Sequence, residues 1–136
     1  MTRQATDEEI AWWDQLTDFQ AHAHNQISNE LRRTGLSLTT YLALDRIVRH
    51  AGPMRISELA AAIHLTPSSA SRLVKKLVAE NHLTRSACGD DRRGVFGHLT
   101  DRGRTTHEKA THHYRTALAQ AIDHPTFSGT TPKEKN

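Results

Sequence analysis

The stretch Leu65-Thr-Pro-Ser-Ser-Ala-Ser-Arg-Leu-Val-Lys-Lys-Leu77 decides the fold of this chain. It predicts a helix in which Thr66 caps the amino end and Pro67 occupies the first turn, where proline lacks only a donor that is unpaired anyway. One face has apolar residues at helical spacing: Ala70, Leu73, Val74, Leu77 and Val78. The other face carries small hydroxyls and cations: Ser68, Ser69, Ser71, Arg72, Lys75 and Lys76. Hydroxyls allow close approach to a groove and cations reach phosphates or guanine edges, so the pattern predicts a DNA recognition helix with Thr66 at its start.

A hairpin with a basic tip is predicted directly after this helix. Residues 83–88 and 95–100 are strand-like, and a polar segment bounded by glycines, residues 89–94, joins them. Arg92 and Arg93 lie at the tip. We expect Arg93 to enter a minor groove, held by a bidentate pair with Asp91. Recognition helix and hairpin together predict a winged helix-turn-helix, the alternative being a solvated hairpin on another small α+β domain.

The residues from 54 to 104 resemble the MarR-type (multiple-antibiotic-resistance regulator) transcription factors. The segments that carry the resemblance are Ser57-Glu-Leu-Ala60, Leu65 to Leu77, Leu83-Thr-Arg85, Asp91-Arg-Arg-Gly94 and Leu99-Thr-Asp-Arg-Gly103. The resemblance implies a mainly α fold with a small β-hairpin wing, in which a winged helix-turn-helix is flanked by long amino- and carboxy-terminal dimerisation helices. It assigns Asp91 and Arg93 the wing roles described above.

Composition and charge fit a DNA-binding protein. The chain has 136 residues and a formal net charge of +3, and residues 66–104 hold eight lysines and arginines against four acids, so the remainder has a charge of −1. A single cysteine, the lack of a long apolar run and an amino end unlike a signal peptide lead us to expect a cytoplasmic protein without a membrane segment.

Long helices are expected on both sides of the winged unit. Thr6 and Glu9 form a capping box that starts a helix reaching about Arg33, and Gly35 ends it. Ser37 caps a second helix whose buried stripe includes Ala51, Ser57 caps the first helix of the helix-turn-helix, and Thr100 caps a last helix to about Asp123 whose apolar stripe includes Ile122. We therefore divide the chain into 1–34 (dimerisation helix), 35–104 (winged helix-turn-helix), 105–124 (dimerisation helix) and 125–136 (disordered tail).

Dimerisation is expected to depend on the first and last long helices. The apolar face of residues 7–33 is longer than a small domain can cover by itself. The resembled family commonly has one more carboxy-terminal helix that interlocks the subunits, and too little apolar sequence follows Ile122 to build it.

The signal to which such a regulator responds has three candidates. Dimers of the resembled family commonly bind phenolic or other aromatic acids in a pocket between the dimerisation helices and the winged domain. Aromatic residues that could line such a pocket here are Trp12, Trp13, Phe19, His22 and Tyr41. Cys88 lies near arginines that would lower the pKa of its thiol, which makes oxidation a possible switch. The ten histidines lack the i, i+4 spacing of a helical metal site, so no metal or other cofactor is expected, although a zinc site assembled between helices is an alternative.

The sequence thus predicts a regulator that binds double-stranded DNA and not an enzyme, because it contains no nucleophile–base arrangement, phosphate loop or paired-carboxylate motif. We expect a homodimeric repressor on a pseudo-palindromic operator, released by a small-molecule effector. The alternatives are the same DNA role with thiol-oxidation or metal sensing, and a winged-helix protein–protein adaptor whose basic face meets an acidic partner.

Overall fold

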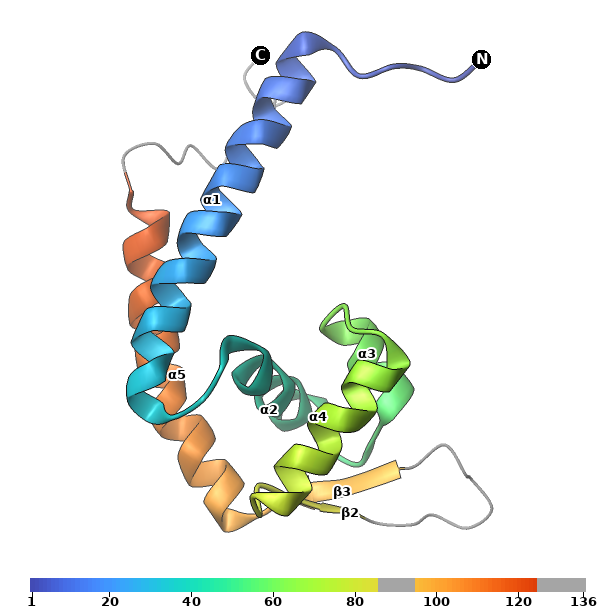
Figure 1. The fold of residues 1–136 in the computed structure, drawn as a ribbon, viewed down its shortest axis with the longest axis vertical. Coiled ribbons are helices and arrows are strands. Elements are labelled where there is room, and N and C mark those ends of the chain that lie inside the picture. Colours follow the sequence, from blue (N-terminus) through green and yellow to red (C-terminus); the bar gives the residue numbers. More distant parts are fainter. Residues whose placement is uncertain (86–94, 125–136) are drawn as a thin grey trace.

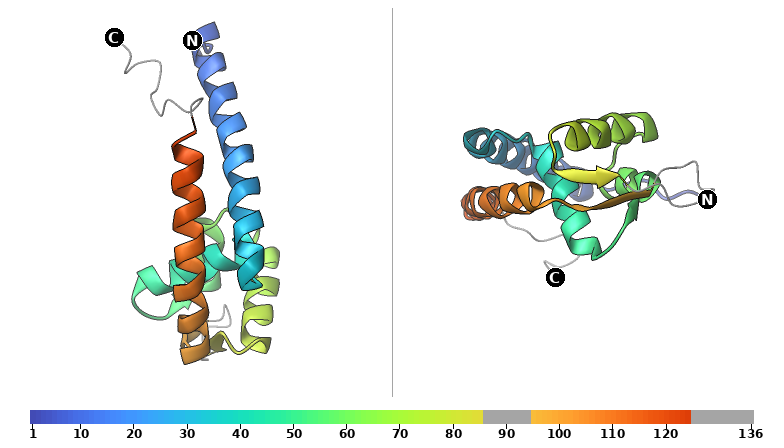
Figure 2. Two further views of the ribbon diagram at one scale, coloured as in Figure 1. Left: turned by 90° about the vertical axis from the view of Figure 1, so that its left-hand side faces the viewer. Right: turned by 90° about the horizontal axis from the view of Figure 1, so that it is seen from below.

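The computed structural model describes residues 1–85 and 95–124, with only the backbone described for 95–97. A helical arm and a winged unit make up the fold (Figure 1). The arm consists of α1 (Asp7–Leu31), a short 3-10 turn η1 (Arg32–Thr34) and α5 (Asp101–Ile122). The two long helices run antiparallel (Figure 2), and the amino-terminal half of α1 extends beyond the end of α5. Small residues allow this close approach, because Ala23 on α1 and Ala110, Ala117 and Ala121 on α5 are buried.

The winged unit contains the remaining elements: α2 (Leu38–His50), β1 (Met54–Arg55), α3 (Ile56–Ala62), α4 (Pro67–Ala79), β2 (Leu83–Arg85) and β3 (Val95–Leu99). Its sheet has the order β1-β3-β2 with antiparallel pairing throughout. Met54 pairs with Phe96, and Leu83 pairs with Leu99. The predicted mainly α fold with a hairpin wing is therefore confirmed, as is the short strand at Met54 that pairs with the wing.

Local capping chemistry sets most helix starts. Side-chain oxygens of Thr6, Ser37, Thr66 and Thr100 accept hydrogen bonds from backbone amides three residues later, as predicted. The prediction for Ser57 was wrong. The helix α3 starts at Ile56, directly after the sheet pairing of Arg55, so Ser57 lies inside the first turn.

Two predicted core positions were also wrong. Ala51 is exposed, because α2 ends at His50 and Ala51 adopts the left-handed conformation (φ 58°) that turns the chain away. Ile122 is 45% exposed, because it is the last residue of α5. The core connects arm and winged unit through Leu31, Tyr41, Leu44, Leu59 and Leu77, all nearly inaccessible to solvent.

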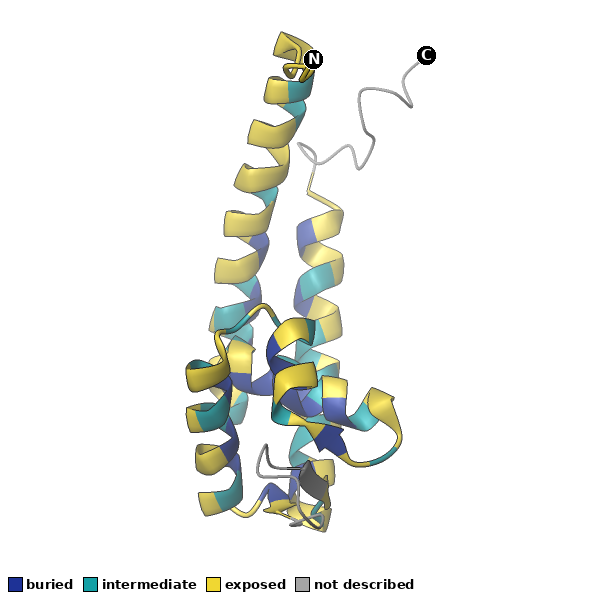
Figure 3. Ribbon diagram, turned by 90° about the vertical axis from the view of Figure 1, so that its right-hand side faces the viewer, coloured by how far each residue is buried: buried dark blue, intermediate teal, exposed yellow. Residues whose placement is uncertain are grey.

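The end of the arm that carries the amino terminus is mostly exposed (Figure 3), and some of its exposed residues are large and apolar. Ile10, Trp13 and Leu16, at 50%, 60% and 36% exposure, lie on the half of α1 that projects past α5. Among the described helices none is long and apolar enough to cross a membrane. The predicted tail, residues 125–136, lies outside the described residues.

Candidate DNA-binding surface

The recognition helix α4 has an amino end fixed by hydroxyl groups. Thr66 Oγ1 accepts a hydrogen bond from the Ser69 amide at 3.2 Å and donates one to Ser69 Oγ at 2.9 Å. Arg72 Nη2 lies 3.4 Å from the same Ser69 Oγ, within reach of a weak hydrogen bond. The cap and the first turn are therefore preorganised, and among the described residues most of the N–H donors of the Arg72 guanidinium have no other partner.

The outer face of α4 presents the predicted polar set to solvent. Thr66, Ser68, Arg72, Lys75 and Lys76 are exposed, and Ser69 and Ser71 are half-buried. The inner face holds the helix against the core through Ala70, Val74 and Leu77, none of which is measurably exposed. Seen from below (Figure 2), α4 lies along one edge of the molecule. A rigid helix with hydroxyls at its amino end and cations along its exposed face has the shape and charge to enter a major groove.

The turns on either side of α4 explain its position. His64 (φ 59°) and Asn81 (φ 63°) both adopt the left-handed conformation, so the chain reverses sharply before and after the helix. The Leu65 amide donates to the Ala60 carbonyl at 2.9 Å, which closes the helix-turn-helix. Lys76 lies near the carboxyl end of α4 and borders a surface hollow with Arg32 of η1 and Leu38 of α2.

The base of the wing is described, but its tip is not. Arg85 is exposed at the end of β2, and the pairing of β2 with β3 shifts register between Leu83 and Arg85. Thr84 Oγ1 donates a hydrogen bond to the His98 carbonyl at 3.1 Å. The predicted tip residues Asp91, Arg92 and Arg93, together with Cys88, lie outside the described residues.

The aromatic residues proposed for an effector lie in different parts of the chain. Trp12 is half-buried and Trp13 exposed near the free end of α1, and Phe19 and His22 follow at successive turns of the same helix. Tyr41 is buried in the core, where its hydroxyl lies 3.1 Å from Thr111 Oγ1 and burial raises its pKa. Its ring is stacked 5.6 Å from that of His107.

Histidines link the helices through carboxylates, a role that the sequence reasoning missed. His107 Nε2 lies 3.0 Å from Asp45 Oδ1 and joins α5 to α2. His113 Nδ1 lies 2.9 Å from Glu30 Oε1 and joins α5 to α1, and this hydrogen bond is the main cause that lowers the pKa of Glu30. In the part of the chain that the structure describes, no three His, Cys, Asp or Glu residues lie together so that they could hold a metal ion.

Comparison with known proteins finds a family match over part of the chain. Residues 34–94 match the model of the MarR family, which covers α2 through β2 and the segment after it. The helix-turn-helix-type transcriptional regulator YkoM of Bacillus subtilis, itself uncharacterized, is 26% identical over 102 residues. The match covers 75% of this chain and 62% of that relative, so the chain spans less than two thirds of the relative's length.

Solved structures share the fold over most of the chain. AbsC, a MarR family regulator from Streptomyces coelicolor, is 27% identical with a TM-score of 0.77, covering 98% of this chain and 88% of its own. Sco3205 from the same organism, in complex with DNA, is 26% identical with a TM-score of 0.78, covering 99% and 83%. The Mycobacterium tuberculosis protein Rv2887, in complex with p-aminosalicylic acid, is 25% identical with a TM-score of 0.67, covering 88% and 87%.

Proposed function

We propose that this chain is a sequence-specific, DNA-binding transcriptional regulator, a role supported by the match of residues 34–94 to the MarR family. The observation that carries the proposal is the outward face of α4, which combines a hydroxyl-capped amino end with exposed Arg72 and Lys75. The DNA complex of Sco3205, a protein of the same fold, supports this interpretation.

In the proposed complex one α4 enters each major-groove half-site of a pseudo-palindromic operator. Base edges are contacted from the amino-terminal half of the helix, by Thr66, Ser68, Ser69, Ser71 and Arg72. Lys75 and Lys76 contact phosphates, which supply affinity without sequence information. Arg93, with Asp91 and Arg92 beside it, reads the flanking minor groove.

The proposed regulator is a homodimer. Support comes from the free half of α1, where Ile10, Trp13 and Leu16 leave a row of apolar surface in solvent. Their spacing of three residues places them on one side of the helix, as a seam between two copies requires. A second copy of this chain would cover them and would set the distance between the two α4 helices.

We further propose a cytoplasmic repressor that a small aromatic acid releases from DNA. The complex of Rv2887 with p-aminosalicylic acid supports this effector class. Release follows if the acid binds the DNA-incompatible dimer more tightly than the DNA-bound form, which shifts the population between them.

Fluorescence anisotropy with the DNA upstream of the protein's own gene tests the proposal, with scrambled DNA as competitor. Wild type should prefer the upstream sequence and lose affinity steeply with salt. Arg72→Ala and Arg93→Ala should weaken this binding, whereas Arg115→Ala, which removes an exposed arginine on α5, should not. Equal, weak binding of both DNAs would contradict the proposal and favour the protein–protein adaptor.

A further inference from the structure

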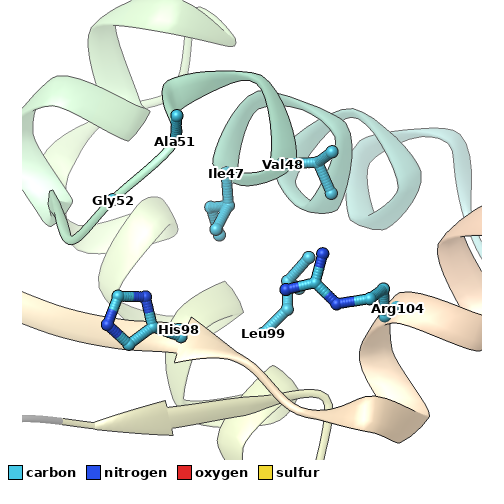
Figure 4. Close-up of a pocket in the computed structure, with 7 residues that line it drawn as sticks. All are labelled: Ile47, Val48, Ala51, Gly52, His98, Leu99 and Arg104. Carbon is cyan, nitrogen blue, oxygen red and sulfur yellow. The ribbon is translucent and has the colours of Figure 1, made fainter.

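Two hollows lie beside the amino-terminal half of α5, and their linings differ in chemistry. The first, of about 320 Å³, lies between α5, β3 and the carboxyl end of α2 (Figure 4). Its walls are largely aliphatic, from Ile47, Val48 and Leu99, and Arg104 and His98 line it from α5 and β3. Such walls make this first hollow a poor environment for a multiply charged, strongly hydrated ligand.

The second hollow, of about 550 Å³, lies between η1 and α5 and is lined by polar residues. Its lining residues are Arg33 and Thr34 of η1 and Thr106, Lys109, His112 and His113 of α5. Four of them carry basic groups, two carry hydroxyls, and none is a carboxylate or a hydrocarbon side chain. The volume is within the range of small-molecule sites. This lining disfavours a ligand that is mainly an apolar ring and favours a polar anion.

The carboxylate of Glu30 lies beside the second hollow and is already paired. Its Oε1 lies 2.9 Å from Nδ1 of His113 and 3.8 Å from Nη1 of Arg33. The hydrogen bond with His113 is the main cause that lowers the pKa of Glu30, and the charges of Arg33 and His112 lower it further. Lys109 is exposed and has no ion-pair partner among the described residues. One acid thus meets several basic groups, which leaves cationic groups available for a second anion.

We propose that the second hollow binds a small phosphate ester with a polar body, such as a sugar phosphate. The forked N–H groups of Arg33 would hold two phosphate oxygens, and Lys109 would supply a further charge from α5. His112 and Thr106 would donate hydrogen bonds to the remaining oxygens or to hydroxyls of the polar body. The ligand would join η1 to α5, and so would fix the turn that leads from the arm into α2.

The test is a titration of the isotope-labelled full chain with glycerol 3-phosphate, followed by backbone amide resonances in the absence of DNA. Glycerol 3-phosphate should bind with a dissociation constant of about 1 mM or below and shift the amides of Thr34, Thr106, Lys109 and His113. Glycerol, which lacks the phosphate, should not shift them, and neither should sodium chloride at the same ionic strength. Benzoate, a single charge on an apolar ring, should bind here at least about tenfold more weakly.

Matched variants locate the site. Arg33→Gln and Lys109→Gln should each weaken binding of glycerol 3-phosphate at least about fivefold. Arg115→Gln removes an exposed arginine of α5 that does not line the hollow, and should leave the binding unchanged. Glu30→Gln should tighten the binding by roughly two- to fivefold, because it releases Arg33 and His113 from their carboxylate partner. The spectra of the unliganded variants report whether each is folded.

Three results would overturn the proposal: shifts centred on other residues, the same shifts with sodium chloride, or equal weakening by Lys109→Gln and Arg115→Gln. The last two would leave only a general attraction of anions to a basic surface. Binding of benzoate as tight as that of glycerol 3-phosphate would overturn the phosphate ester as the ligand class. Because no residue of α4 lines the hollow and the titration contains no DNA, each of these results would leave the proposed DNA binding standing.

Discussion

Gly103, in the first turn of α5, lies so close to His82 that a Cβ on the glycine would overlap the His82 carbonyl oxygen. Two hydrogen bonds join the same segments. The Thr100 amide donates to the His82 carbonyl at 3.1 Å, and Thr100 Oγ1 donates to the Asn81 carbonyl at 2.5 Å. The chain that leaves the recognition helix is thus fixed to the start of the arm by one close contact and two hydrogen bonds.

Gly103→Ala should lower the free energy of unfolding by about 2–3 kcal/mol, because the new methyl group meets backbone and cannot be relieved by a side-chain rotation. The helix propensity of alanine would offset only about 1 kcal/mol of this cost. Gly52→Ala is the matched control, since its Cβ would meet nothing within 4 Å. Urea denaturation measures both, and equal midpoints for the two variants would contradict the proposed close packing.

The contact between Gly103 and His82 also marks the limit of what the sequence could predict. Helix starts at Thr6, Ser37, Thr66 and Thr100 were predictable, because capping joins residues only three apart. The exposed face of α4 followed from periodicity for the same local reason. Ser57 was misassigned because the preceding strand pairing, a long-range contact with β3, decided where α3 begins.

The hollow beside Arg104 could not be predicted either. Its walls are contributed by residues 47–52, 98–99 and 104, which only tertiary packing brings together. The resemblance suggested that aromatic residues of α1 and α2 line an effector pocket, but their helical spacing is equally suited to a helix face that packs on another helix. The positions of Tyr41 in the core and Trp13 in solvent separate the members of that set.

Acid should destabilise the protein through His82. The side chain is buried, and among the described residues its Nδ1 has no hydrogen-bond partner. Burial is the main cause that lowers the pKa of His82, Arg102 lowers it further and Glu80 opposes the change. The unfolded chain therefore binds the proton more readily than the folded one, and stability is fully present above about pH 6.5 and falls as the pH drops below it.

His82→Leu should reduce this pH dependence, because leucine fills the site without a titratable nitrogen. Urea midpoints measured from about pH 7.5 down to about pH 5 compare the variant with wild type. His24→Gln, which removes an exposed histidine of α1, is the control and should keep the wild-type slope. If the urea midpoints of wild type and His82→Leu fell equally with decreasing pH, a group other than His82 would cause the acid sensitivity.

Arg72 and Lys75 should affect DNA binding in different ways, because one is proposed to read bases and the other phosphates. Arg72→Ala should cost about 1–3 kcal/mol on the preferred operator and relax discrimination at one base pair of each half-site. Lys75→Ala should weaken all sequences alike and reduce the salt dependence by about one phosphate contact. Anisotropy titrations at several salt concentrations separate the two, and a uniform loss for both variants would contradict base reading by Arg72.

The dimer proposal predicts that a charge at Trp13 will separate the subunits. Trp13→Glu places a carboxylate in the apolar row of α1, where a second copy would bury it at a cost of several kcal/mol. Sedimentation velocity should then find monomer at concentrations where wild type is dimeric.

Gln15→Glu adds the same charge at an exposed position of the same helix and should leave the dimer intact. Since Trp13 is 60% exposed in the single chain, the variant should keep its helical circular dichroism. If Trp13→Glu remained dimeric, the interface could not lie on the free half of α1. The spacing of the two recognition helices would then have to be set by α5.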